Sequence, residues 1–318
     1  MKRMAVNQDS LLRVARKANE LFVIPGGIDR LLEPMSVSDG TRAPLFEVVA
    51  AFCTNIRSVV STAGIPYTFA LEASHRRRHQ LLECAAELEA TLDGTRAGQG
   101  VAGVAELARR DAQERMRDVS ASEDGRAALN HEACCLLLDV SKVAELHEAA
   151  GQLVLQAAVL TWGAFEVLSR DIFKEHLNRT PSAYAQLVAD TDVRKRFELG
   201  KIPIERVADF GFDLSAKLGE FLADQNDLTD LGTIKATMLA LFPANERLRT
   251  ALAQRDLWTL FQRRHLIVHR RGIVDRRYLE ATGDPLEIRA RLAINPQELT
   301  RYLGVVVEAA GALVSAAG

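Results

Sequence analysis

The sequence predicts an all-α protein, and three observations support this fold class. Apolar residues recur at three- and four-residue spacing, and Gly and Pro separate the segments that carry this pattern. Alanine and leucine are abundant while aromatic residues make up only 6% of the chain, a mix that favours helices over sheets. With 48% hydrophobic and 26% charged residues, the 318-residue chain has the composition of a globular protein with a full core.

The first part of the chain, residues 1–125, is predicted to be a helical region. Helices are expected up to residue 22 and over 44–64, 68–92 and 104–119. The glycine-rich stretch 93–103 contains a GxGxxG pattern at 98–103, but the segment before it has helical spacing rather than that of a strand. An interhelical loop is therefore favoured over a dinucleotide site. The small and polar residues 120–125 give the expected boundary to a second domain, 126–318.

The second part, residues 126–318, is predicted to contain longer and more apolar helices. One or two helices cover 127–177, with a break expected at Gly151. Shorter helices are expected over 183–197, 214–222 and 232–241, and a longer one over 246–271 that Gly272 ends. Residues 286–294 alternate between apolar and polar types and are expected to be extended. Asn295, Pro296 and Glu298 then have the order of an N-cap, a first-turn proline and a capping-box acid, which predicts a final helix.

Charge, cysteine usage and hydropathy indicate a cytoplasmic protein. The net charge of −2 gives no overall nucleic-acid signal, and the four cysteines form no CxxC pair. The N-terminus lacks the apolar core of a secretion signal. The longest apolar stretch, 153–168, is expected to be too short and too polar to span a membrane. The segment 75–79, HRRRH, is expected to be a solvated basic face rather than a metal site, because its three arginines would repel a cation.

Two charged residues interrupt apolar helix faces, and this is the most informative feature of the sequence. Successive helix residues rotate by about 100°, which places Arg264 only about 20° from Leu257, within the stripe formed with Leu260, Phe261, Ile267 and Val268. Glu166 lies in the same way at the centre of the apolar face formed by Leu155, Val159, Trp162, Phe173 and Leu177. Because an unpaired buried charge is costly, we expect Glu166 and Arg264 to form an ion pair where the two helices pack.

Two histidines follow this arginine in the sequence. His265 and His269 lie one helical turn apart, and a pKa near neutrality would suit them to acid–base chemistry. The segment 263–277 contains six arginines and one acid, Asp275, so a phosphate group is the expected ligand of this surface.

The segment 264–269, RHLIVH, followed by RRGIVD, resembles the R-x4–6-H motif of HEPN domains, which are helical bundles found in toxins, phage-defence systems and RNA-processing enzymes. The residue after the motif arginine is usually polar, often asparagine, and here it is His265. The segment 162–166, WGAFE, resembles the earlier HEPN helix, whose acidic residue faces that arginine. The resemblance covers roughly residues 151–318, and it implies a HEPN-like bundle in the C-terminal half.

The resemblance also implies an activity. Many HEPN proteins are RNA endonucleases that need no metal or other cofactor and form homodimers in which two motifs face one cleft. His269 would be the acid–base group, Arg264 would orient the scissile phosphate and His265 would assist, with Glu166 as support. Arg263, Arg270 and Arg271 would contact RNA. The products would carry 2′,3′-cyclic phosphate and 5′-hydroxyl ends, and an antitoxin or other defence-system protein would be a partner.

Two other functions remain open at this level. The first is a non-catalytic HEPN module that binds RNA, nucleotide or a protein partner. The second is a helical scaffold for a larger complex, with residues 1–125 as its docking part.

Overall fold

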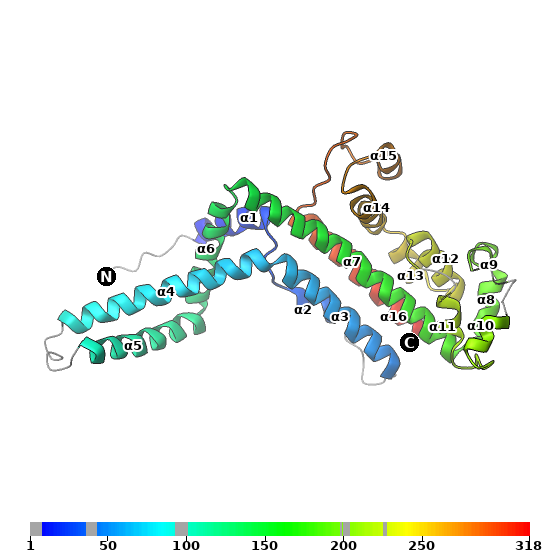
Figure 1. Cartoon of the computed structure of the whole chain (residues 1–318), viewed down its shortest axis with the longest axis horizontal. Helices are drawn as coiled ribbons and strands as arrows, with labels where there is room; N and C mark the ends of the chain where they lie inside the picture. Colours follow the sequence, from blue (N-terminus) through cyan, green and yellow to red (C-terminus); the bar gives the residue numbers. More distant parts are fainter. Residues whose placement is uncertain (1–7, 36–42, 93–100, 198, 200–203, 225–227) are drawn as a thin grey trace. The chain divides into compact units, whose positions relative to one another are not determined.

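The computed structural model describes residues 8–35, 43–92, 101–197, 199, 204–224 and 228–318, and the described chain is all-α, as predicted (Figure 1). It falls into two compact units, each built from two separate stretches of sequence. Unit 1 comprises residues 1–25 and 63–152, and unit 2 comprises 26–62 and 153–318. This division differs from the predicted boundary at residue 125, because helices on both sides of that position pack together in unit 1.

Unit 1 contains two long helices and shorter ones that cover them. Helix α4 packs against both α5 and α6, and α1 packs against α6. The helices of unit 1 are α1 (Gln8–Leu21), α4 (Ile65–Leu92), α5 (Val101–Ala121) and α6 (Glu123–Val140), and α7 (Ala144–Arg179) begins in this unit. The core is formed largely by small side chains with Phe22, Tyr67 and Leu137 among them, so the helices approach closely.

The predicted linker 120–125 is a tight helix–helix turn. Helix α5 ends at Ala121, and Ser122 caps α6 by accepting a hydrogen bond from the Gly125 N–H at 3.1 Å. A Cβ atom at Gly125 would lie 2.0 Å from the carbonyl oxygen of Val119, which explains why a glycine stands there. The small polar residues therefore mark a capped turn rather than a domain boundary.

Unit 2 is built around α7 from residue 153 onward and the C-terminal helix α16. Arg179, the last residue of α7, donates a hydrogen bond of 2.6 Å to the carbonyl oxygen of Ala317 near the end of α16. Helices α13 (Glu246–Leu252) and α14 (Arg255–Arg270) pack on α16 (Pro296–Ala317), and α12 (Leu231–Leu241) packs on α8 (Tyr184–Ala189), α9 (Thr191–Arg196) and α13. The core includes fully buried Trp162, Phe165 and Phe173 of α7 and Tyr302 of α16.

The remaining elements of unit 2 are mostly short. They are α2 (Ile28–Leu32), η1 (Glu33–Met35), α3 (Ala43–Ala63), η3 (Pro181–Ala183), α8 (Tyr184–Ala189), α9 (Thr191–Arg196), α10 (Ile204–Asp209), α11 (Leu218–Ala223), α12 (Leu231–Leu241), α13 (Glu246–Leu252), α14 (Arg255–Arg270), α15 (Arg276–Thr282) and α16 (Pro296–Ala317).

Several predicted boundaries are confirmed and others are wrong. The capping box that opens α16 is complete. The Glu298 N–H donates a hydrogen bond of 2.8 Å to the Asn295 side chain, and the Asn295 N–H donates one of 3.1 Å to the Glu298 carboxylate. The break expected at Gly151 is absent, because the 36-residue helix α7 runs through that position. The extended segment expected at 286–294 contributes only one antiparallel bridge, between Ile273 and Arg291.

Three helices of the described chain are long and apolar enough to cross a membrane, judged by length and composition alone: Leu45–Ala63, Ala144–Arg179 and Pro296–Ala317. For α7 this differs from the expectation based on residues 153–168, because the helix is much longer than that stretch. Half of its most apolar window is buried within the protein, as is 61% of the corresponding window of α16.

Candidate active site

Helix α14 carries the predicted motif, and its C-terminal end has the geometry that the sequence predicted. The helix stops at Arg270, and Arg271 and Gly272 both adopt left-handed φ angles, of 55° and 73°. The backbone N–H groups of both residues donate hydrogen bonds to the carbonyl oxygen of Leu266. The start is later than predicted, because residues 246–252 form the separate helix α13 and a turn precedes Arg255. Gly272 thus fixes the position of His269 in the last helical turn.

The predicted ion pair between Glu166 of α7 and Arg264 of α14 is present. Arg264 Nη2 lies 3.5 Å from Glu166 Oε1, with side-chain exposures of 22% and 16%. The same carboxylate oxygen accepts a hydrogen bond of 2.5 Å from Trp162 Nε1, one turn earlier on α7. The guanidinium therefore faces a carboxylate whose own orientation is fixed by the indole N–H.

The predicted buried stripe of α14 is correct at Leu257 and Leu260 but differs toward the C-terminal end of the helix. Leu257, Leu260, Arg263 and Leu266 are the buried residues of the helix. Val268, which was expected in the stripe, is 48% exposed. Arg264 thus lies at the margin of the buried face, where its guanidinium can contact both Glu166 and a ligand.

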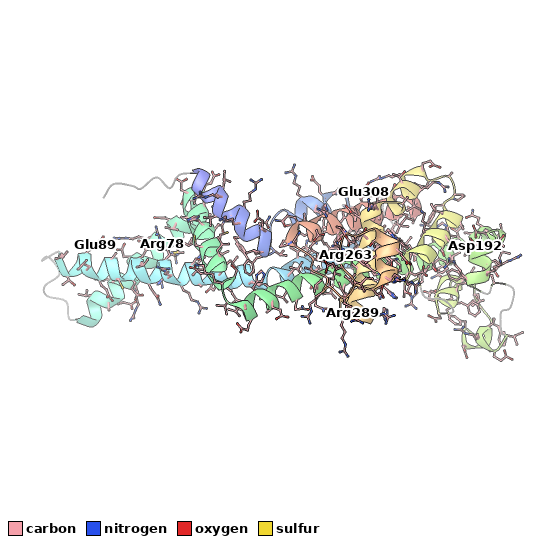
Figure 2. The ribbon with its side chains drawn as sticks, turned by 90° about the horizontal axis from the view of Figure 1, so that it is seen from above. Arg78, Glu89, Asp192, Arg263, Arg289 and Glu308 are labelled. Carbon is pink, nitrogen blue, oxygen red and sulfur yellow. The ribbon has the colours of Figure 1, made fainter. Side chains whose placement is uncertain are left out.

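Arg263 is the buried cation of α14, and this corrects its expected role in RNA binding. Its side chain is 8% exposed and lies 2.9 Å from both Asp284 Oδ2 and Glu298 Oε1. The Nε atom donates to the hydroxyl of Tyr278 at 3.1 Å, and the Tyr278 hydroxyl is itself hydrogen-bonded to Asp284. Figure 2 shows Arg263 among the helices of this segment. A guanidinium held by these groups and the ring of Tyr302 is not available to a phosphate.

The Arg263 network joins three elements around the site. Tyr278 belongs to α15, Asp284 to the loop after it and Glu298 to α16. Burial, together with the hydrogen bond to Asp284, raises the pKa of Tyr278 to about 12, so this hydroxyl remains protonated at neutral pH. The network therefore fixes the segment 271–295 against α14.

The two histidines form an exposed pair on the outer face of α14. The ring centroids of His265 and His269 lie 4.6 Å apart, and the rings are tilted by 44°. Desolvation lowers the pKa of His265, and the charges of His269, Arg277 and Arg264 lower it further, against the opposing effect of Asp275. His265 is therefore neutral at pH 7 and can accept a proton or a hydrogen bond.

The segment after α14 folds back beside the histidines and brings a further arginine to the site. The Val274 N–H is donated to Ala290 O at 2.9 Å and the Leu292 N–H to Gly272 O at 2.8 Å. This return places the exposed Arg277 of α15 close enough to act on the pKa of His265. Composition indicated a cluster of arginines in this segment. His265 and Arg277 are 12 residues apart in the sequence, and their proximity depends on a return of the chain that helical periodicity does not predict.

The two other arginines predicted to contact RNA are exposed. The Arg270 side chain is 65% exposed and its Nε lies 3.6 Å from Asp275 Oδ2. Arg271 is exposed in the turn that ends the helix. Figure 2 shows Arg289, another exposed arginine of the segment, at its edge.

Other candidate sites from the sequence have structural explanations. In the segment 75–79, Arg76 pairs with Glu72, Arg78 with Glu132 and His79 with Glu83, so acids balance much of the basic face. The GxGxxG residues 98–100 lie outside the described residues, and 101–103 belong to α5. Within the described ranges, no group of three or more His, Cys, Asp and Glu residues could hold a metal ion. The four cysteines are free thiols.

Comparison of the chain with protein-family models, with curated proteins and with solved structures returned no match.

Proposed function

We propose that this protein is a metal-independent RNA endonuclease of the HEPN type. The observation that supports the proposal is the arrangement around Arg264. Its guanidinium is paired with Glu166 at 3.5 Å, and the same helix presents His265 and His269 to solvent with their rings 4.6 Å apart. An oriented guanidinium and two imidazoles on one helix provide charge stabilisation and proton transfer, which are the two requirements of RNA transphosphorylation.

In the proposed mechanism, His269 accepts the proton of a ribose 2′-hydroxyl. The 2′-oxygen then forms a bond to the adjacent phosphorus, and the bond from phosphorus to the 5′-oxygen breaks. That oxygen takes up a proton from solvent water, giving 2′,3′-cyclic phosphate and 5′-hydroxyl ends. Arg264 stabilises the charge that develops on the phosphate oxygens, and His265 assists as a neutral hydrogen-bonding group. DNA lacks the 2′-hydroxyl and is not a substrate.

The proposed RNA contacts are the exposed arginines Arg270 and Arg271, together with Arg277. These side chains lie in the last turn of α14, at its end and in α15. Exposed arginines that are not enclosed by acids can exchange counterions for phosphates, which makes the affinity salt-dependent.

We further propose that the protein acts as a homodimer through the helices that carry the site. Four large apolar side chains on α7, on α14 and just after α14 are between 37% and 50% exposed: Leu160, Val167, Val268 and Ile273. We assign these four side chains to the proposed association face.

The cellular role follows from the HEPN resemblance alone. We propose that the protein is a toxin or phage-defence effector, that it acts in the cytoplasm and that it does not bind a membrane. An antitoxin or another defence-system protein would control its activity.

The test is incubation of the wild type and a His269→Ala variant with total RNA in EDTA, followed by mapping of the new ends. The wild type should produce 2′,3′-cyclic phosphate and 5′-hydroxyl ends, and the variant should not. His147→Ala is a matched control, because His147 is also an exposed helical histidine but lies in the part of α7 that belongs to unit 1.

Three outcomes separate the functions. RNA cleavage that depends on His269 supports the nuclease. Binding of RNA without cleavage by either protein would indicate a non-catalytic binding module instead. Neither binding nor cleavage would leave the helical scaffold as the better description.

A further inference from the structure

An exposed aromatic side chain lies on the same face of α14 as the two histidines. Trp258 is 38% exposed, whereas Trp162, the other tryptophan of the chain, is fully buried. His265 follows Trp258 by seven residues, so the two side chains differ in direction by about 20° around the helix axis and lie about 10 Å apart along it. His269 lies about 20° to the other side and about 16 Å away. The indole and both imidazoles therefore project in nearly the same direction.

The Trp258 ring is held in place. Its Nε1 atom donates a hydrogen bond of 3.2 Å to the carbonyl oxygen of Ala281 in α15. Its ring centroid lies 5.8 Å from that of Phe261, and Phe261 lies 5.1 Å from Trp162 in turn. Because the indole N–H is already bonded, the exposed part of the ring offers a π surface rather than a hydrogen-bond donor.

The same side chains connect this ring to the catalytic arginine. Trp162, which packs on Phe261, donates its indole N–H to Glu166, and Glu166 pairs with Arg264. The ring and the guanidinium are thus fixed relative to each other by a continuous series of packed and hydrogen-bonded side chains. A ligand that touches both would meet a preorganised surface.

We propose that Trp258 is a stacking platform for an unpaired base, so that the substrate is single-stranded RNA with its cleaved phosphate at Arg264 and His269. This inference rests on the proposed function for the identity of the ligand. The rise along the helix from Trp258 is about 9 Å to Arg264 and about 16 Å to His269, which corresponds to about three to five nucleotides at 3.4 Å per stacked nucleotide. Every base has a π face, so the platform selects unpaired over paired RNA while tolerating different sequences.

The test uses a single-stranded 2′-O-methyl oligoribonucleotide, which cannot be cleaved, and intrinsic tryptophan fluorescence. Trp258 is the exposed one of two tryptophans, so a stacked base should quench its emission and should protect it from acrylamide. A duplex of the same sequence should bind more weakly and cause less quenching. This measurement on the wild type requires no variant to fold.

Three variants test the contact itself. Trp258→Leu should weaken oligonucleotide binding by about tenfold to a hundredfold, since stacking on an aromatic side chain is worth this much per base. Trp258→Phe retains a ring and should recover most of the affinity. Phe46→Leu removes a more exposed ring, 54% exposed on α3 of the same unit, and should leave the affinity unchanged.

The proposal is overturned if Trp258→Leu binds as tightly as the wild type, if the bound oligonucleotide leaves Trp258 emission unaltered, or if the wild type binds no single strand. Its failure is distinguishable from failure of the nuclease assignment. Cleavage that depends on His269 but not on Trp258 would reject only the platform. Binding that depends on Trp258 without any RNA cleavage would reject only the nuclease.

Discussion

Replacement of Arg263 by methionine should strongly destabilise the C-terminal unit. The substitution keeps most of the side-chain volume and removes the cation that lies 2.9 Å from both Asp284 and Glu298. Breaking a buried ion pair by removing one partner costs about 3–5 kcal/mol, because the remaining charges stay desolvated. Since the two carboxylates are each 18% exposed and keep some contact with water, we expect the lower end, about 3 kcal/mol.

Urea unfolding followed by tryptophan fluorescence measures this change, because Trp162 and Trp258 both belong to unit 2. The matched control is Arg301→Met, which removes the same charge from a side chain that is 57% exposed and 3.9 Å from its partners. We expect that control to lose less than about 1 kcal/mol. Equal losses in the two variants would refute the reasoning. Adding Asp284→Asn to Arg263→Met should restore part of the stability, since it removes one stranded charge.

Three further predictions concern capping, close packing and pH. Asn295→Ala removes the side-chain cap of α16 and should cost about 1 kcal/mol in the same urea titration, with a loss below a few tenths contradicting a stabilising cap. Gly219→Ala places a Cβ atom 2.1 Å from a backbone carbonyl oxygen of α7 and should cost about 2 kcal/mol or more, whereas Gly151→Ala, which meets open space, should gain up to about 1 kcal/mol. The pKa of His265 in the folded protein lies below the value of 6.5 expected in the unfolded chain. As the pH falls through 6.5, the unfolded chain therefore binds more protons than the folded protein does. The contribution of His265 to the free energy of unfolding is complete above that pH and decreases below it. NMR titration of the imidazole should show a higher pKa in Arg277→Gln, and an unchanged value would exclude the proposed proximity.

Local rules predicted the helical class and several of the contacts that matter for the site. The left-handed residues Arg271 and Gly272 end α14 next to the predicted position, and residues 295–298 open α16 because their side chains satisfy the first N–H groups. The pairing of Glu166 with Arg264 was predictable for a similar reason. Each charge interrupts an apolar face, and opposite charges of this kind reduce their desolvation cost by meeting.

The sequence predicted Arg264 as the buried arginine and Arg263 as an exposed one, but Arg263 is the more buried of the two. Helical periodicity alone is therefore insufficient to predict which of two adjacent residues is buried. A helical repeat gives the width of an apolar stripe but not the side on which other elements cover it. Residues 278–298 return to α14 and bury Arg263, so the covered face is displaced toward that residue. Only knowledge of this return could have distinguished the buried, structural arginine from the one that pairs with Glu166.

The domain boundary was wrong for a related reason. Small polar residues occur in linkers and also in tight capped turns, and Ser122 is of the second kind. Unit 1 combines residues 1–25 with 63–152, an association between distant segments that composition does not encode.

The Glu298 carboxylate is divided between two tasks, and this limits what can replace it. One oxygen accepts the Asn295 N–H at the start of α16, and the other accepts the guanidinium of Arg263. A glutamine has a single acceptor oxygen, so its amide group could serve the helix start or the arginine but would turn an N–H toward the remaining donor. Glutamine, which has the same shape as glutamate, therefore leaves two hydrogen-bond donors facing each other. The junction between α14 and α16 requires a side chain as long as that of Glu298 with two acceptor oxygens at its end.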